Sequence, residues 1–123
     1  MDHAETFFRK VNTYKGIIVD VQTDMVKLQN DAITLREVVH HPGGVCAFAI
    51  DDDSMVTLVR QFRYPFGKAV LELPAGKLEP GEEPFTTAQR ELMEEVGAAA
   101  AAWTDLGELI PSPGCYAETL HMY

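Results

Sequence analysis

The most informative chemical feature of the sequence is a group of three glutamates within five residues: Glu91, Glu94 and Glu95. Residues 84–96 predict a helix, with Pro84 in its first turn and Gly97 at its end. At about 100° per residue the three carboxylates share one helical face, with Arg90 at its edge. Hydrophobic residues occupy another face and predict packing on a core: Phe85, Ala88, Leu92 and Val96.

This acidic face is unfavourable for helix stability. Like charges four residues apart cost a few tenths of a kcal/mol, and the helix dipole disfavours negative charge near the C-terminal end. Clustered carboxylates are, however, the oxygen ligands that Mg²⁺ prefers. The cluster therefore favours a metal site, and the alternative is a solvated acidic face on a surface helix.

The residues around the glutamates follow the pattern G-x5-E-x7-R-E-U-x-E-E-x-G-U, where U is a bulky aliphatic residue. The matching positions are Gly76, Glu82, Arg90, Glu91, Leu92, Glu94, Glu95 and Gly97. Seven fixed positions coincide by chance with odds on the order of one in a million. Residues 76–98 thus resemble the Nudix box of the Nudix hydrolases, and Ala98 departs from it by being smaller than the usual final aliphatic residue.

Further motifs resemble the ADP-ribose pyrophosphatase branch of that family, although related sugar-nucleotide hydrolases share them. They are Arg36-Glu37-Val38-Val39, His41-Pro42-Gly43, Gln61-Phe62-Arg63, Glu72-Leu73-Pro74-Ala75-Gly76-Lys77, and Ser112-Pro113-Gly114 followed by Glu118. The resemblance implies hydrolysis of a nucleoside diphosphate linked to another moiety, foremost ADP-ribose to AMP and ribose 5-phosphate. It also implies Mg²⁺ as the cofactor, with Mn²⁺ as a substitute.

Carried over position by position, the resemblance assigns roles to particular residues. The implied metal ligands are Glu91 and Glu95, with Glu94 close by and the carbonyl of Ala75. Glu118 is the implied general base, or the group that fixes the attacking water. The alternative is that Glu118 is an exposed loop glutamate without a catalytic role. Glu94 is a further catalytic candidate, and Arg90 with Glu82 is expected to orient the box.

Substrate binding is assigned to three residues outside the box. Arg63 has a planar guanidinium suited to phosphate oxygens, and its alternative is a strand-end surface arginine. Arg36 matches a position that in this branch reaches the substrate across a dimer interface. Glu37 belongs to the same motif and is grouped with Arg36.

Composition and charge restrict the remaining possibilities. The 123 residues predict one domain, residues 1–123, and the net charge of −9 argues against nucleic-acid or anionic-membrane binding. The longest apolar run, Ala98–Trp103, is far shorter than the ~20 residues that cross a bilayer, and the N-terminus lacks a secretory pattern. Cys46 and Cys115 match no metal or redox spacing and are expected as core thiols, with a lone disulfide as the alternative. These features favour a cytoplasmic protein.

The elements that must position these residues are mostly strands, so we expect an α+β Nudix fold with the box helix packed on a mixed sheet. Residues 14–39 predict an N-terminal antiparallel hairpin arm. A second hairpin is expected from residues 45–50 and 55–62, with further strands at 69–73, 103–110 and 119–123. Residues 98–102 are expected to form a loop.

The sequence also differs from the branch, whose members usually continue with further strands and a C-terminal helix. That helix is expected to be absent here. An inactive or truncated nucleotide-binding or assembly module, and a Nudix nucleoside triphosphatase, therefore stay open as alternatives. The arm carries more apolar residues than two strands can bury, so we expect a homodimer formed through it.

Overall fold

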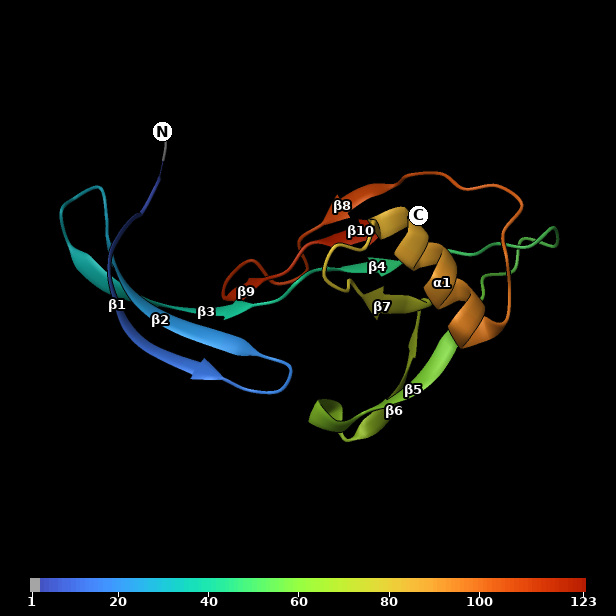
Figure 1. The fold of residues 1–123 in the computed structure, drawn as a ribbon, viewed down its shortest axis with the longest axis horizontal. Coiled ribbons are helices and arrows are strands. Elements are labelled where there is room, and N and C mark those ends of the chain that lie inside the picture. Colours follow the sequence, from blue (N-terminus) through green and yellow to red (C-terminus); the bar gives the residue numbers. More distant parts are fainter. Residues whose placement is uncertain (1–2) are drawn as a thin grey trace. The chain divides into compact units, whose positions relative to one another are not determined.

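The computed structural model describes residues 3–123, which form two compact units (Figure 1). Unit 1 contains the described residues up to His41 together with Ile110–Glu118. Unit 2 contains Pro42–Leu109 and Thr119–Tyr123. The prediction of a single domain over residues 1–123 stays a prediction.

Unit 1 is a four-stranded sheet in the order β1-β2-β3-β9. Its strands are β1 (Thr6–Lys15), β2 (Asp20–Lys27), β3 (Ile33–His40) and β9 (Tyr116–Ala117). The first three strands are antiparallel, and β9 lies parallel to β3. A turn at Asp31, with φ of 63°, joins β2 to β3 and is closed by the Leu28 N–H, which donates to the Ala32 carbonyl over 2.8 Å.

The N-terminal arm is larger than the sequence predicts. The arm was expected as a hairpin over residues 14–39, but it consists of three long strands. The additional strand is Thr6–Lys15, of which the predicted arm included only the last two residues. Aromatic and β-branched residues alternate irregularly with polar ones in β1, and two register shifts interrupt its pairing with β2. This irregularity weakens the two-residue period from which strands are predicted.

Unit 2 is built on a mixed sheet in the order β7-β4-β10-β8. Its strands are β4 (Gly44–Cys46), β7 (Ala75–Lys77), β8 (Gly107–Leu109) and β10 (Leu120–Met122). β4 and β10 are parallel neighbours, whereas β7 and β8 are antiparallel edge strands. The strand expected over residues 103–110 is thus shortened to three residues, and residues 98–102 form the expected loop.

The expected hairpin of residues 45–50 and 55–62 forms only next to its turn. β4 pairs with β7 and β10, and the two expected strands meet only at the bridge between Ile50 and Val56. Residues of the second segment instead form β5 (Val59–Arg63), which pairs antiparallel with β6 (Lys68–Glu72). The prediction paired the two segments because they are neighbours in the sequence. Strand pairing depends instead on side-chain packing and burial, which here involve segments far apart in the chain.

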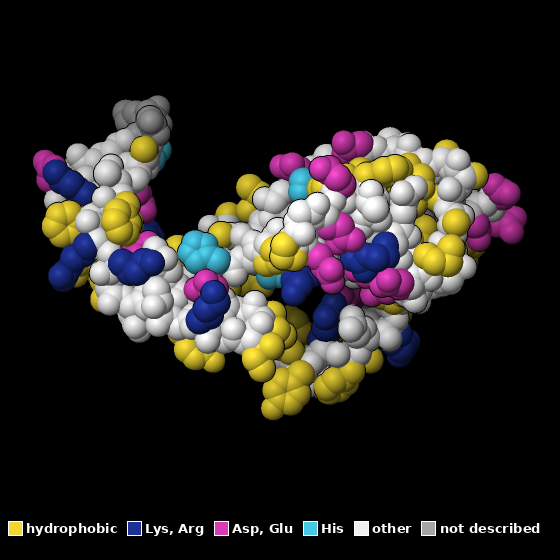
Figure 2. Space-filling model, in the orientation of Figure 1, with side chains coloured by type: hydrophobic (Ala, Val, Ile, Leu, Met, Phe, Trp, Pro, Cys, Tyr) yellow, Lys and Arg dark blue, Asp and Glu magenta, His cyan; other side chains and the backbone are white. Residues whose placement is uncertain are grey.

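The β5–β6 hairpin is closed by the 3₁₀ turn η1 (Tyr64–Phe66) and by Gly67, whose φ of 61° is left-handed. The tip carries exposed aromatic residues, with Tyr64 at 89% and Phe66 at 72%. Figure 2 shows hydrophobic side chains gathered at this tip, at the bottom of the view.

The helix α1 (Pro84–Val96) has the bounds that the sequence predicts. Gly97 ends it with φ of 67°, and its N–H donates to the Met93 carbonyl over 2.9 Å. α1 packs on β7 and β4 and buries three side chains against the centre of the sheet: Thr87, Ala88 and Leu92. The buried core below is Val45, Cys46 and Ala47.

Phe85 is less buried than the predicted apolar face implies, at 41% exposed. It belongs to an aromatic cluster in which its ring centroid lies 5.5 Å from those of both Trp103 and Tyr123. The cluster connects the start of α1 to the segment that follows the loop and to the end of β10. The α+β prediction, with one helix on a mixed sheet, is confirmed.

No helix within residues 3–123 has the length and hydropathy needed to cross a bilayer. Both cysteines are free thiols, and the expectation that both are core residues is wrong for Cys115, which is exposed. Cys46 is buried, and burial raises the pKa of its thiol.

Candidate functional site

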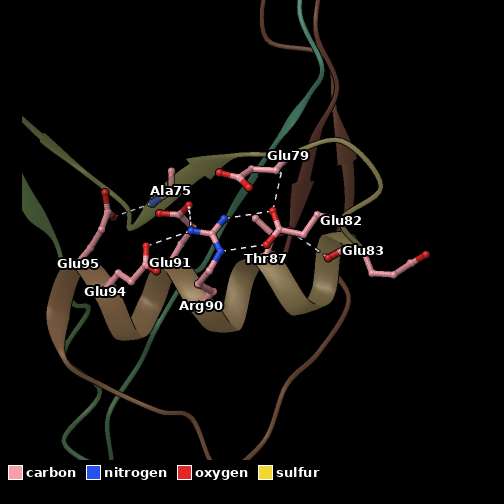
Figure 3. A network of polar contacts seen from close by, with 9 residues as sticks. All are labelled: Ala75, Glu79, Glu82, Glu83, Thr87, Arg90, Glu91, Glu94 and Glu95. Carbon is pink, nitrogen blue, oxygen red and sulfur yellow. Dashed lines mark hydrogen bonds and ion pairs between the residues drawn. The ribbon is translucent and has the colours of Figure 1, made fainter.

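The candidate site of unit 2 lies where the acidic face of α1 meets the backbone of β7 (Figure 3). Gly76 makes this contact possible, because a Cβ atom at that position would lie 2.0 Å from Cδ of Glu91. The Glu91 carboxylate therefore occupies the space that any other residue at position 76 would fill. Its side chain is only 15% exposed.

Arg90 is the centre of the charged network on this face. Its Nη1 donates to Oε1 of Glu91 over 2.7 Å and to Oε2 of Glu94 over 3.0 Å. Its Nε and Nη2 donate to the two carboxylate oxygens of Glu82 over 2.9 and 3.1 Å. Figure 3 shows the guanidinium between the three carboxylates, so one positive charge compensates part of the repulsion that the sequence predicts.

The Glu82–Arg90 contact is the pair that the sequence predicts, and it shifts both titrations. The hydrogen bonds from Arg90 lower the pKa of Glu82 to about 2, and the backbone N–H of Glu79 and the side chain of Thr87 add to this effect. The same contact raises the pKa of Arg90. Glu82 is thus anionic throughout the physiological range and fixes the guanidinium in place.

Glu95 makes a different contact from the other two glutamates. Its Oε2 accepts a hydrogen bond from the backbone N–H of Ala75 over 3.0 Å. This bond ties the last turn of α1 to the first residue of β7. Ala75 was expected to contribute its carbonyl to a metal, and the structure places the residue against one of the predicted carboxylate ligands.

The donor set fits a hard divalent cation. Glu91 and Glu95 are each held by one carboxylate oxygen, while Oε2 of Glu91 and Oε1 of Glu95 have no hydrogen-bond partner among residues 3–123. In this conformation no three His, Cys, Asp or Glu side chains of the described chain converge as a preformed cluster. Carboxylate oxygens are the ligands that Mg²⁺ takes, and Gly76 removes the side chain that would obstruct them.

Arg63 also belongs to unit 2, at the end of β5. Its Nε and Nη2 donate to Oε1 and Oε2 of Glu72 over 2.7 and 2.6 Å, so the contact is bidentate. The pKa of Arg63 is raised by these hydrogen bonds and by the negative charges of Glu72 and Glu95. The pKa of Glu72 is lowered, chiefly by the hydrogen bonds from Arg63.

The other predicted site residues lie in unit 1. Arg36 on β3 makes a bidentate ion pair with Glu5 through Nε and Nη2, and its Nη1 donates to the Leu35 carbonyl over 2.9 Å. The pKa of Arg36 is raised by the hydrogen bonds to Glu5. Glu37, the next residue on β3, is exposed.

Glu118 lies in the short connection that follows β9, and its side chain is partly buried. Its Oε1 lies 3.3 Å from Nδ1 of His41, and the two side chains are only 20% and 12% exposed. The parallel pairing of β3 with β9 brings them together, and the His41 ring lies 5.5 Å from that of Tyr116. Burial and the nearby Glu118 charge raise the pKa of Tyr116.

Two partners of these residues were missed by the sequence reasoning. His41 and Glu72 appear in the sequence only as parts of motifs, without an expected contact of their own. Nothing in the chain signals the His41 contact, because it depends on a two-residue strand. The Glu72 contact has no local signal either, because Arg63 lies opposite Lys68 and Glu72 lies four residues further along β6.

The chain belongs to the Nudix family. The family model described as NUDIX domain matches residues 40–123. The resemblance seen in the sequence is therefore confirmed at the level of the family.

Individual relatives extend this result. The chain is 40% identical to an ADP-ribose pyrophosphatase of Bacillus subtilis over 97% of its own length and 64% of that protein. It is 42% identical to a methanol dehydrogenase activator of Bacillus methanolicus over 89% of its length and 60% of that protein. A crystal structure of an ADP compounds hydrolase shares the fold with a TM-score of 0.85 at 23% identity, covering 96% of this chain and 64% of that one. The chain thus spans less than two thirds of each of these proteins.

Proposed function

We propose that this protein is a Mg²⁺-dependent hydrolase of the pyrophosphate bond in a nucleoside diphosphate linked to another moiety. The leading substrate is ADP-ribose, which with one water gives AMP and ribose 5-phosphate. The observation that carries the proposal is the approach of the Glu91 carboxylate to the backbone of β7 at Gly76. The similarity to the ADP-ribose pyrophosphatase of Bacillus subtilis supports the choice of substrate.

In this proposal Glu91 and Glu95 hold Mg²⁺, or Mn²⁺ in its place, with Glu94 and the Ala75 carbonyl as further ligands. When bound, the ion neutralises pyrophosphate charge and makes a bound water more acidic. Arg90 keeps the Glu91 carboxylate oriented through a 2.7 Å hydrogen bond.

Residues outside the box complete the proposed chemistry. Arg63 donates to phosphate oxygens of the substrate. Arg36, with Glu37 of the same motif, contacts the substrate of the partner chain across the proposed dimer interface. Glu118 accepts a proton from the attacking water, or fixes that water by accepting its hydrogen bond. Glu94 is the further candidate for the same proton.

We also propose that the protein is a homodimer through its N-terminal arm. In unit 1 the sheet leaves large hydrophobic side chains exposed on β1 and the following turn, including Phe7 at 59%, Tyr14 at 63% and Ile18 at 73%. A soluble monomer rarely tolerates an apolar surface of this kind, and a two-fold interface is the common way to cover it. Light scattering at micromolar concentration should give twice the mass of the chain, and the mass of a single chain would refute the dimer.

A cytoplasmic location completes the proposal. The net charge of −9 and two free thiols support it, because unpaired cysteines persist in reducing compartments. The same charge opposes nucleic acid or an anionic membrane as a partner.

The proposed function is tested by a panel of nucleotide sugars and nucleoside triphosphates, each with Mg²⁺ or with EDTA, analysed for products by chromatography. We expect AMP from ADP-ribose in Mg²⁺ alone. Preferential turnover of triphosphates would replace the proposal with a nucleoside triphosphatase. Nucleotide binding without turnover would indicate a binding or assembly module.

A further inference from the structure

The strongest unassigned feature of the molecule is the ion pair between Arg63 and Glu72 on the β5–β6 hairpin. In the antiparallel register Arg63 lies opposite Lys68, and Glu72 lies four residues further along β6, opposite Val59. Strand residues two and four apart share a face, so Lys68, Val70 and Glu72 are on the same face as Arg63. At about 3.4 Å per residue, the Arg63 side chain runs back along the hairpin for several residues to reach Glu72.

The pair leaves part of the guanidinium available. An arginine has five N–H donors, and the contact with Glu72 uses the edge formed by Nε and Nη2. Nη1 has no hydrogen-bond partner among the described residues, so a second edge, formed by Nη1 and the remaining Nη2 hydrogen, stays unused. A planar fork of this kind matches two oxygens of a phosphate.

The pair also lies close to the acidic face of α1. Glu72 is three residues before Ala75, whose N–H holds Glu95. Arg63 is near enough to Glu95 for the two charges to attract each other. The bidentate contact with Glu72 thus holds the positive charge of Arg63 within reach of Glu95.

We propose that Glu72 is a positioning residue that fixes Arg63 so that its free edge binds a phosphate oxygen pair of the nucleoside diphosphate. This inference rests on the proposed function for the identity of the ligand. An exposed ion pair by itself adds little to stability, so holding the guanidinium in one orientation is the effect expected of this contact. Preorganisation of this kind improves binding because less side-chain freedom is lost when the ligand arrives.

The test compares Arg63→Ala, Glu72→Gln and the double variant. Titration calorimetry in EDTA measures binding of ADP-ribose and, separately, of inorganic pyrophosphate. We expect Arg63→Ala to weaken binding about tenfold or more, as for a lost hydrogen bond to a charged group. Glu72→Gln should weaken it about threefold or more, and the double variant should bind like Arg63→Ala alone. In Mg²⁺ the same variants should raise KM with little change in kcat.

Two controls separate positioning from folding or general charge. Arg60→Gln removes a positive charge from the opposite face of the same hairpin, since Arg60 and Arg63 differ by an odd number of residues, and should bind normally. Glu72→Asp keeps a bidentate acceptor and should recover part of the affinity that Glu72→Gln loses. Urea unfolding midpoints should stay close to that of the wild type in every variant.

Wild-type affinity in Glu72→Gln, or losses from the two single changes that add in the double variant, would overturn the inference. Failure of the proposed function has a different signature. Pyrophosphate binding that depends on Arg63 and Glu72, without turnover of ADP-ribose, would refute the enzyme and retain the positioning role. Turnover of ADP-ribose with an unchanged KM in Glu72→Gln would refute the positioning role and retain the enzyme. A wild-type protein that binds neither ADP-ribose nor pyrophosphate would refute both proposals.

Discussion

Replacement of Gly76 by alanine should separate activity from folding more clearly than any other change. The new Cβ would lie 2.0 Å from Cδ of Glu91, 2.1 Å from its Oε1 and 2.5 Å from its Cγ. Contacts below 3.0 Å are essentially never seen, so the carboxylate must move by at least 1.0 Å, the difference between 3.0 and 2.0 Å. It must move by 1.4 Å to reach the ordinary contact distance of 3.4 Å. A misplacement of about 1 Å in a catalytic group can cost about 10²-fold in rate, so we expect kcat to fall at least about 100-fold.

The cost to stability should be modest, because the obstructing atoms belong to the end of a flexible side chain. Moving Glu91 loses a partly exposed hydrogen bond from Arg90 and forces a less favourable rotamer, which together cost about 1–3 kcal/mol. That is less than the ~5–15 kcal/mol that holds a typical domain together. The variant should therefore be folded and nearly inactive.

The assay for this prediction is AMP release from ADP-ribose in Mg²⁺, paired with urea unfolding. Gly114→Ala is the matched control, since no atom lies within 4 Å of its new Cβ and its φ is ordinary. Retention of a third or more of wild-type kcat by Gly76→Ala would refute the reasoning, because it would mean that the Glu91 position does not matter. Global unfolding of the variant would refute the estimate of stability.

Three further predictions concern the carboxylates. Glu95→Gln should abolish Mg²⁺-dependent turnover. The unfolding midpoint should stay equal or rise slightly, because the Gln oxygen can still accept the hydrogen bond from the Ala75 N–H and one repulsive charge is removed. Turnover near that of the wild type would show that Glu95 is not a metal ligand. Glu118→Gln should lower kcat about 10²–10⁴-fold with little change in KM, and a loss of two- or threefold would return it to a structural role beside the histidine. Glu82→Gln should be less stable than wild type above pH 4.5. Because the pKa of Glu82 falls from 4.5 unfolded to about 2 folded, the stability that it contributes is lost as pH drops between these values. The free energies of unfolding of the two proteins should converge near pH 2, and a difference that does not vary with pH would contradict the assigned cause.

The sequence predicted α1 and its acidic face well because both depend on local spacing. Pro84 and Gly97 mark the ends of the helix, and the 3.6-residue period places Glu91, Glu94 and Glu95 together whatever the rest of the chain does. The pairing of Arg90 with Glu82 followed from the same motif. The buried part of the helix was predicted less well, since Phe85 packs at the margin with Trp103 rather than in the core.

Strand pairing could not be predicted to the same degree. β4 takes its partners from residues 75–77 and 120–122, so no local pattern identifies them. The pairing of β9 with β3 rests on two residues, and it is this pairing that places Glu118 beside His41. The register of β5 with β6 is likewise needed to see that Arg63 turns back toward Glu72.

The central claim is that the carboxylates of α1 that meet β7 support Mg²⁺-dependent cleavage of a nucleoside diphosphate. Its most direct test is ³¹P NMR of ADP-ribose with the wild-type protein and with Glu91→Gln, each in Mg²⁺ and in EDTA. The pyrophosphate signals should disappear, and those of AMP and ribose 5-phosphate should appear, only for the wild type in Mg²⁺. Persistence of the pyrophosphate signals in that sample, or equal cleavage by Glu91→Gln, would contradict the claim.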